Sequence, residues 1–288
     1  MTGIYYADML DVLVAAGCRV AESSTTDGWQ TRARSSGGFP APPLAVFWHH
    51  TASQTSPAND LSYMIDGCDD APVGNLLLDR TGTFWPIAAG ASNCAGKGGP
   101  ATFSRGTIPL DSGNTRGFQV ECASNGVGEP WPQVQVDALF AASNALNAHV
   151  GNLPSDVITH QAWAPTRKID PATADAVEGP WRPGAVTSSG TWSLPDIAAE
   201  CVARAAAGPA PTPPQPEDDD MPRYLVTDSA TGRWYVTDMA TYKTYVPDPG
   251  LASEGIALFG WQGYGDGPWG LGAGWSPYLD QLPEVADR

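Results

Sequence analysis

An imidazole, an ammonium group and a carboxylate occur close together in the segment 160–171. His160 follows the apolar run 157–159, and Lys168 and Asp170 lie further along the same Pro-bounded segment, which we expect to be a loop. A loop at the end of a strand is where a rigid scaffold presents functional side chains. Two histidines and an aspartate form a ligand set that leaves zinc a fourth position for water, so His160 and Asp170 predict a metal site if a second histidine joins them.

The best source of this second histidine is another apolar run, which ends in His49-His50-Thr51-Ala52. Residues 45–50 predict a buried strand, whose side chains alternate between the two faces of a sheet. Alternation places Ala45, Phe47 and His49 on one face and Val46, Trp48 and His50 on the other. Only one of the two imidazoles can therefore point into a given site. Two strand ends that meet at one edge of a sheet would assemble the ligands.

These motifs resemble the zinc-dependent type-2 N-acetylmuramoyl-L-alanine amidases, a family that includes phage endolysins, bacterial recycling amidases and peptidoglycan recognition proteins. The resemblance rests on His-x-Thr-Ala after a buried strand and on His-x9-Asp with a lysine two residues before the aspartate, and it covers roughly residues 5–185. It implies an α/β fold with a mixed central β-sheet flanked by helices. It also implies that His49, His160 and Asp170 bind Zn²⁺ and that His50 is a packed neighbour; the reverse assignment of His49 and His50 is the alternative.

Glu121 lies near the end of a third predicted strand, 117–122. Together with Asn114 it resembles the family's Asn-x3-apolar-x-apolar-Glu stretch, in which the glutamate is the catalytic base. A glutamate paired with a surface cation is the alternative, but an acidic residue inside an apolar run needs a partner, and a metal-bound water is a good one. The resemblance gives Lys168 the role of stabilising the oxyanion that forms during amide hydrolysis.

Two positions depart from the family pattern. Some relatives have a tyrosine with a catalytic role where Gly74 stands, and that role must be filled elsewhere here. Relatives often have a histidine where Cys94 stands, in the Gly-rich segment 88–100, which we expect to lie outside the core. The Cys94 thiol is either a buried, inert group or an adventitious zinc ligand.

Composition narrows the possible partners and location. The net charge of −16 argues against nucleic acid, because phosphates would be repelled. Five cysteines without a CxxC pair indicate free thiols of a chain made in a reducing cytoplasm. Residues 1–20 lack the basic leader of a signal peptide and carry two aspartates, and they do not read as a membrane span. We expect the protein in a host cytoplasm until the membrane is permeabilised, and then at the host cell wall, without membrane insertion.

The remaining pattern predicts the elements that position these residues. Helices are expected at 5–16, 59–65, 132–150 and 193–207. The first has Met9, Leu10, Leu13 and Val14 on one apolar stripe. Asn59 is the expected cap of the second, and Ser193 and Asp196 form a capping-box variant at the start of the last. Two apolar runs, 73–79 and 83–87, flank Arg80-Thr81-Gly82 and predict a hairpin. His149 falls in the last turn of a helix, where an imidazole complements the helix dipole, and is not expected to bind metal.

Four regions follow from this reading. An N-terminal helix and lead-in segment, 1–43, would pack on a zinc amidase catalytic domain, 44–208. Residues 209–220 are a Pro-rich acidic linker. Residues 221–288 are an aromatic-rich module containing a ten-residue repeat, 227–236 and 237–246, which predicts a small β-meander. Most of the module's aromatic residues are expected to fill its core, and those within 263–275 are candidates for binding wall glycan.

The sequence therefore predicts a phage endolysin that cuts the amide bond between N-acetylmuramic acid and L-alanine in bacterial peptidoglycan. Three other classes remain open. A non-catalytic peptidoglycan-binding protein could share the fold, although relatives of that kind usually lack a metal ligand. A zinc peptidase that cuts within the stem peptide could use a similar ligand set. A structural protein of a phage particle would have no need of the Lys-x-Asp-Pro segment.

Overall fold

The computed structural model describes residues 3–207 and four short strands, at 224–228, 234–237, 243–246 and 269–271. The chain divides into two compact units, Met1–Thr212 and Pro213–Arg288. The first unit holds every predicted metal ligand and catalytic residue. No helix among the described residues is both long and apolar enough to cross a membrane.

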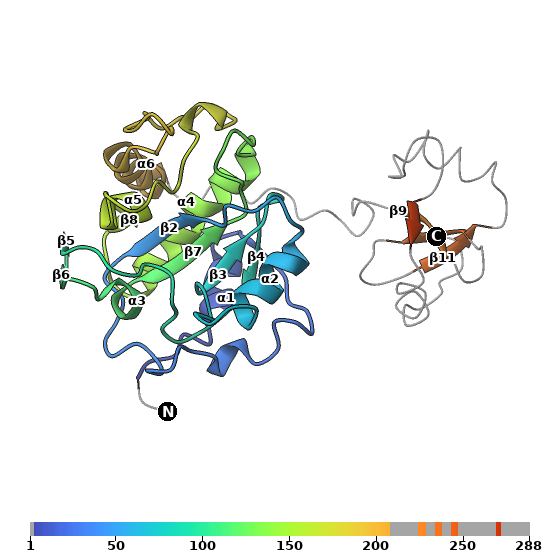
Figure 1. Cartoon of the computed structure of the whole chain (residues 1–288), viewed down its shortest axis with the longest axis horizontal. Helices are drawn as coiled ribbons and strands as arrows, with labels where there is room; N and C mark the ends of the chain where they lie inside the picture. Colours follow the sequence, from blue (N-terminus) through green and yellow to red (C-terminus); the bar gives the residue numbers. More distant parts are fainter. Residues whose placement is uncertain (1–2, 208–223, 229–233, 238–242, 247–268, 272–288) are drawn as a thin grey trace. The chain divides into compact units, whose positions relative to one another are not determined.

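A six-stranded mixed sheet forms the centre of the first unit (Figure 1). Its strands follow the spatial order β1 (Arg19–Val20), β4 (Thr83–Pro86), β3 (Leu76–Leu78), β7 (Phe118–Cys122), β2 (Val46–His50) and β8 (Val157–Thr159). Neighbouring strands run parallel except for the antiparallel pair β3 and β4. The predicted α/β class with a mixed central sheet is confirmed.

Both faces of this sheet are buried, because the apolar strands alternate their side chains between a large core on one face and smaller cores on the other. Leu76 and Leu78 of β3 join the large core on one face, whereas Leu77 joins a smaller core on the other. In β2, Val46 and Trp48 belong to the large core. Ala45, just before β2, and Phe47 pack on the opposite face, so the predicted alternation along residues 45–50 is confirmed.

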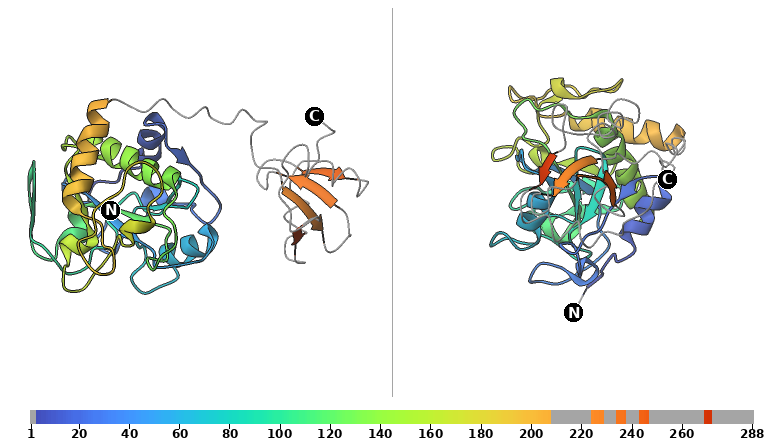
Figure 2. Two further views of the ribbon diagram at one scale, coloured as in Figure 1. Left: turned by 90° about the horizontal axis from the view of Figure 1, so that it is seen from above. Right: turned by 90° about the vertical axis from the view of Figure 1, so that its right-hand side faces the viewer.

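Three helices cover the face of the large core: α1 (Met9–Ala15), α4 (Gln133–His149) and α6 (Leu194–Ala207). Figure 2 shows them together on one side of the sheet in its left view. Met9, Leu10 and Leu13 of α1 are buried, but Val14 is 52% exposed. Its inclusion in the apolar stripe was wrong, because Val14 lies about 140° around the helix from Met9 at 100° per residue.

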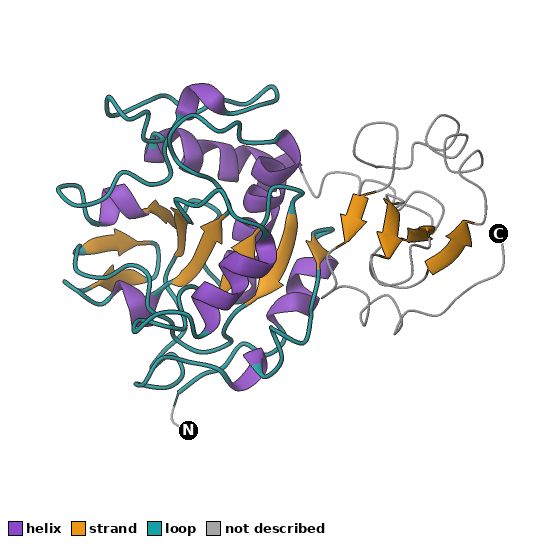
Figure 3. Ribbon diagram, turned by 45° about the vertical axis from the view of Figure 1, so that its right-hand side comes forward, coloured by secondary structure: helices purple, strands orange, loops and turns teal. Residues whose placement is uncertain are grey.

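The opposite face carries α2 (Pro57–Ile65) and the one-turn helices α3 (Gly113–Arg116) and α5 (His160–Trp163), so the strands lie between two helical layers (Figure 3). The N-cap of α2 is Ser56, whose hydroxyl accepts a hydrogen bond from the Asn59 amide. The expected cap, Asn59, was wrong because Pro57 has a backbone suited to the first helical position and starts the helix earlier.

The N-terminal segment is integrated with the sheet. Strand β1, which the sequence pattern did not reveal, pairs with β4, and Trp29 of the 3-10 turn η1 (Trp29–Thr31) is buried and donates a hydrogen bond to Glu22. The Arg32 guanidinium donates to the Ile87 carbonyl at 2.6 Å. These contacts hold residues that precede β2 against strands that follow it.

The predicted hairpin is formed by β3 and β4. Gly82 has a φ of +79° in the connecting turn, a conformation that glycine adopts without steric cost. The Asp79 carboxylate accepts hydrogen bonds from the Thr81 and Thr83 amides. A second hairpin, β5 (Ala101–Phe103) with β6 (Gly106–Ile108), forms a separate two-stranded sheet.

The Gly-rich segment 88–100 is irregular, as expected, but its first half is buried, contrary to expectation. Ala88, Ala91, Ser92 and Ala95 are all fully buried. Small side chains let this backbone pack closely: a Cβ on Gly99 would lie 2.2 Å from the Trp163 ring. The first half of the segment therefore belongs to the core while carrying no regular structure.

Helix α6 begins with half of the predicted capping box. The Ser193 hydroxyl accepts from the Asp196 amide at 3.4 Å, but the Asp196 carboxylate binds the Gly184 amide instead of reaching back to Ser193. The Ser193 amide donates to the Gly184 carbonyl. A neighbouring loop thus replaces the second half of the box.

In the second unit, β9 (Tyr224–Asp228), β10 (Trp234–Thr237) and β11 (Lys243–Val246) pair antiparallel in succession, which is the arrangement of a β-meander. A fourth strand, β12 (Trp269–Leu271), pairs parallel with β9. The remainder of the predicted aromatic glycan-binding region, including most of 263–275, lies outside the described residues, as does the linker 209–220.

Candidate active site and metal centre

Two parallel strands bring the predicted histidines to one edge of the sheet. His49 lies near the end of β2, and His160 follows the last residue of the adjacent strand β8. Thr159 starts the helical turn α5 by accepting a hydrogen bond from the Ala162 amide. The segment expected to be only a loop therefore begins with a helix, which fixes the direction of the His160 side chain.

The backbone after α5 turns so that Asp170 returns to the same place. The Gln161 amide donates to the Asp170 carbonyl at 3.0 Å, and the amides of Arg167 and Lys168 both donate to the Ala164 carbonyl. This closes the segment 161–170 into a compact turn. Asp170 is consequently adjacent to His160 in space.

Three potential ligand atoms converge in the buried site. The Nδ1 atoms of His49 and His160 lie 2.8 Å apart, and the Asp170 Oδ2 atom lies 2.9 Å from His160 Nδ1 and 3.4 Å from His49 Nδ1. The three residues are 0%, 2% and 6% exposed respectively. The structure thus brings together all three residues that the sequence analysis proposed as ligands.

The outer ring nitrogens show why the inner ones can act as ligands. His49 Nε2 faces the Gln119 Oε1 atom at 2.9 Å, and the Gln119 amide nitrogen is held by the carbonyls of Gly113 and Gly117. His160 Nε2 faces the Ala95 carbonyl at 3.0 Å. Both partners are acceptors, so each Nε2 carries the hydrogen and each neutral ring points an Nδ1 lone pair inward.

Two lone pairs and a carboxylate pointing at one another require a positive charge between them. A proton on His49 would supply this charge. Burial is the strongest influence on His49 and opposes its charged form, but the hydrogen bond to Asp170 and the charge of Glu121 raise its pKa above the ordinary value. Burial and the charge of His49 lower the pKa of His160 to about 4. Burial would raise the pKa of Asp170, but the two histidines hold it well below its usual range.

A divalent metal ion fits the same position. His49, His160 and Asp170 form a group whose ligand atoms all lie within 4.8 Å of one another. Ligand atoms around tetrahedral zinc lie about 3.3 Å apart for bonds of about 2.0–2.1 Å, so a small outward movement of the two imidazoles would suffice. A second group, His49 with Cys94 and Glu121, shares one of these ligands.

Glu121 lies beside the three ligands because β7 pairs with β2 in a register that places Glu121 opposite His49. Its side chain is buried; Oε1 lies 2.9 Å from the Cys94 sulfur, and Oε2 has no hydrogen-bond partner among the described residues. Burial raises the pKa of Glu121 above its ordinary value, against the opposing charge of His49. A carboxylate with one unused oxygen and a raised pKa suits a general base.

Lys168 is half-buried next to this group. No carboxylate of the described residues lies within ion-pairing distance of its ammonium group. Burial is the largest influence on the pKa of Glu121 and of His160. The charge of Lys168 makes a smaller contribution, which lowers both pKa values. An ammonium group that is close to the site and not neutralised can stabilise negative charge developing there.

The other two histidines lie away from the converging atoms. His50 is on the opposite face of β2, where its ring centroid lies 6.4 Å from that of Trp131, and burial lowers its pKa. His149 at the end of α4 lies 3.3 Å from the Asp8 carboxylate. The choice of His49 over His50 agrees with the geometry, because strand alternation sends His50 into the other core.

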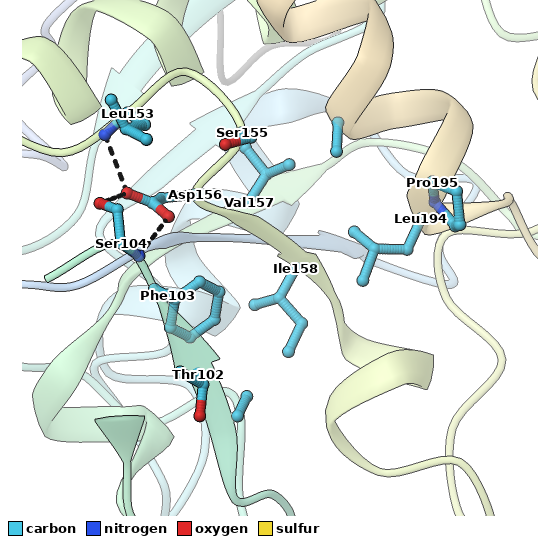
Figure 4. Close-up of a pocket in the computed structure, with 12 residues that line it drawn as sticks. Thr102, Phe103, Ser104, Leu153, Ser155, Asp156, Val157, Ile158, Leu194 and Pro195 are labelled. Carbon is cyan, nitrogen blue, oxygen red and sulfur yellow. Dashed lines mark hydrogen bonds between the residues drawn. The ribbon is translucent and has the colours of Figure 1, made fainter. Parts of the chain in front are cut away.

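Two of the hollows on the first unit bear on the site assignment. One, of about 330 Å³, is lined by Glu121 and by residues of α2 and the preceding loop, including Thr51, Asp60 and Tyr63. It therefore opens onto the candidate base. The other lies between β5, β8 and α6; its carboxylate, Asp156, is already bound by Ser104 and by the Leu153 amide (Figure 4). This second hollow contains none of the candidate residues.

The functions of Gln119 and Ala95 and the partner of Cys94 were not predicted from the sequence. Gln119 could have been found, since it is a polar residue two positions before Glu121 in an otherwise apolar strand and so lies on the same face. The carbonyl of Ala95 carries no sequence signal, because every residue has one. The contact between Cys94 and Glu121 joins residues 27 positions apart, which spacing alone does not reveal.

Comparison with known proteins relates this part of the chain to a family model. Residues 39–173 match the family model Amidase_2, described as N-acetylmuramoyl-L-alanine amidase. This segment contains His49, Glu121, His160, Lys168 and Asp170. The match confirms the resemblance to these amidases for that segment, which is shorter than the resemblance expected from the motifs. None of the curated proteins compared with the sequence matches it.

Several solved structures are similar to parts of the chain. They include the N-acetylmuramyl-L-alanine amidase AmiD from E. coli, in complex with anhydro-N-acetylmuramic acid-L-Ala-D-gamma-Glu-L-Lys, at 19% identity and a TM-score of 0.38 over 50% of this chain and 57% of that chain. The endolysin amidase LysCS from Clostridium intestinale has 15% identity and a TM-score of 0.38 over 55% of this chain and 89% of that chain. AmpDh3 from Pseudomonas aeruginosa has 16% identity and a TM-score of 0.38 over 51% of this chain and 60% of that chain. The chain thus spans little more than half of AmiD.

Proposed function

We propose that this protein is a zinc-dependent N-acetylmuramoyl-L-alanine amidase that hydrolyses the bond between N-acetylmuramic acid and L-alanine in bacterial peptidoglycan. The observation that carries the proposal is the convergence of His49 Nδ1, His160 Nδ1 and Asp170 Oδ2, with both outer ring nitrogens held by acceptors. The match of residues 39–173 to the amidase family supports the choice of substrate bond.

The donor set fits zinc by its chemistry. Imidazole nitrogen and carboxylate oxygen are ordinary zinc ligands, and three protein ligands leave one position open. His49, His160 and Asp170 would hold the ion, while Gln119 and the Ala95 carbonyl orient the two rings. When bound, zinc supplies a lowered pKa for water and polarisation of a carbonyl group.

The chain's other residues handle the proton and the charge. Glu121 accepts a proton from the attacking water through Oε2, the oxygen without a partner, and returns it to the nitrogen of the leaving L-alanine. Its raised pKa suits both halves of this transfer. Lys168 stabilises the negative charge that forms on the former carbonyl oxygen. The hollow that reaches Glu121 along α2 would receive the substrate.

The biological role we propose is that of a phage endolysin, held in the host cytoplasm until the membrane is permeabilised and then acting on the host cell wall. The division into two compact units supports this role, because a catalytic unit followed by a targeting unit suits an enzyme that acts on an insoluble wall. We further propose wall glycan as the ligand of residues 221–288. Pelleting the full chain with walls before and after removal of their glycan polymers tests this ligand.

Mass spectrometry of soluble products from purified peptidoglycan, digested with and without a zinc chelator, tests the reaction. We expect stem peptides with a free L-alanine amino terminus, formed only without chelator. Cuts inside the stem, with the muramyl linkage intact, would instead identify a peptidase. Binding to the wall without product release would identify a recognition protein and contradict the enzymatic proposal.

A further inference from the structure

The short segment 94–96 touches both the candidate base and a candidate metal ligand. The amides of Cys94 and Gly96 donate to the Asn114 side-chain oxygen at 2.9 and 3.2 Å. The Ala95 carbonyl accepts from His160 Nε2. The Cys94 sulfur lies 2.9 Å from Glu121 Oε1. Asn114 therefore fixes a segment whose neighbouring residues contact Glu121 and His160.

The Cys94 thiol is the donor in its contact with Glu121. An ionised carboxylate can only accept hydrogen bonds, whereas a thiol can donate one. Burial and the nearby charge of Glu121 raise the pKa of Cys94 well above its usual value, so the sulfur keeps its proton. The contact occupies Oε1 and leaves Oε2 as the oxygen without a partner.

We propose that Cys94 is a positioning residue, which holds the Glu121 carboxylate by donating its S–H to Oε1 so that Oε2 is presented for proton transfer. This inference rests on the proposed amidase function, because it takes Glu121 as the base. The effect on the reaction is indirect, through the rotation of one carboxylate. Asn114 supports it by fixing the backbone from which the thiol projects.

The competing use of the thiol is direct metal binding, since Cys94 also belongs to the group with His49 and Glu121. That use would require the sulfur to lose its proton and leave Glu121 without its present partner. A metal-binding thiolate would also fill the position that water needs. If the thiol positions Glu121, removing the sulfur should lower kcat. If the thiolate binds the metal in place of water, removing it should raise kcat.

Cys94→Ala and Cys94→Ser in the full zinc-loaded chain separate these uses. We expect Cys94→Ala to lower kcat roughly 10-fold, the scale on which such supporting contacts act, with KM and zinc content unchanged. Cys94→Ser restores a donor and should recover most of the lost kcat. Cys201→Ala, at a buried thiol of α6 in the large core, is the control and should keep the kcat of the wild type.

Two spectroscopic measurements do not depend on turnover. In infrared difference spectra between wild type and Cys94→Ser, the S–H stretch of Cys94 should lie at the low frequency of a strong donor and move to higher frequency in the Glu121→Ala background. In the cobalt-substituted protein, the wild type should lack a sulfur-to-cobalt charge-transfer band.

Unchanged or increased kcat in Cys94→Ala, an S–H band insensitive to Glu121, or a sulfur-to-cobalt band would each overturn the positioning role. If the wild type releases no amidase product, the proposed function fails, and the infrared comparison still decides separately whether Cys94 donates to Glu121.

Discussion

The Nδ1 atoms of His49 and His160 face each other at 2.8 Å although 111 residues separate them in the chain. Two neutral rings in this arrangement repel through their lone pairs unless a cation lies between them. The outer nitrogens cannot relieve the repulsion, because the Gln119 Oε1 atom and the Ala95 carbonyl can only accept hydrogen bonds, so each outer nitrogen keeps its hydrogen. The site is therefore organised around a positive charge.

Replacing His160 with alanine should abolish stoichiometric zinc binding and amidase activity, because it removes one of three ligands. Circular dichroism should show a fold largely retained, since α5 is a single turn at the edge of the sheet. Metal analysis and the product assay check both losses. His149→Ala, at the end of α4, is the matched control and should keep zinc; a fully active His160→Ala variant would show that the ligand assignment is incorrect.

Replacing Glu121 with glutamine should lower kcat by about 10²- to 10⁴-fold, the usual contribution of a general base. Zinc should remain bound at one equivalent, because the three ligands are intact. Glutamine can still accept the Cys94 hydrogen bond, so misplacement of the side chain would not explain the loss. Retained turnover would mean that another group accepts the proton.

Replacing Lys168 with methionine removes the ammonium group and keeps a similar length. We expect kcat to fall by about 10²-fold, comparable to loss of a single oxyanion donor, with little change in zinc affinity. Lys97→Met alters an exposed lysine and should have no such effect. Equal activity of the two variants would argue against a role for Lys168 in stabilising the oxyanion.

Replacing Gln119 with leucine removes the acceptor that fixes the His49 ring. The affinity for zinc should fall about 10- to 100-fold, as found for groups that orient metal-binding histidines. Competition with a chelator measures the change. Gln30→Leu, in the 3-10 turn near the N-terminus, where the side chain is exposed, provides the control. Unchanged affinity in Gln119→Leu would mean that His49 is oriented by other contacts.

The zinc affinity should depend on pH through His49. Its pKa is raised in the metal-free protein, so zinc must displace a proton there, and affinity should drop about tenfold per pH unit below that pKa. The raised pKa of His49 also makes the stability of the protein depend on pH. A raised folded pKa stabilises the metal-free protein fully below the unfolded value of about 6.5, and this stabilisation is lost as pH rises through the folded pKa.

Thermal unfolding across this pH range checks the second expectation. With a chelator present, Tm should decline as pH rises above about 6.5. With zinc bound, the ion replaces the proton and this decline should disappear. Identical pH profiles with and without zinc would contradict a shared proton in the site.

Local sequence pattern was sufficient for several features of the site. Alternation along residues 45–50 correctly separated His49 from His50, because the side-chain direction in a strand depends only on the parity of the position. The hairpin and α4 followed from local turn chemistry and periodicity. Predictions were wrong where they ignored the effect of a neighbouring residue. Pro57 starts α2 earlier than predicted. The Asp196 carboxylate, expected to complete the cap of α6, instead accepts a hydrogen bond from the Gly184 amide.

The sequence by itself thus determined which side chains could do chemistry and on which face of its strand each one lies. Only the tertiary structure decided that His49, His160 and Asp170 converge, because that depends on β8 lying beside β2 and on the turn through 161–170. The roles we infer for Gln119 and Cys94 have the same origin. Their partners come from other segments of the chain, and the register and packing that join such segments arise from the burial of the whole sheet rather than from any local pattern.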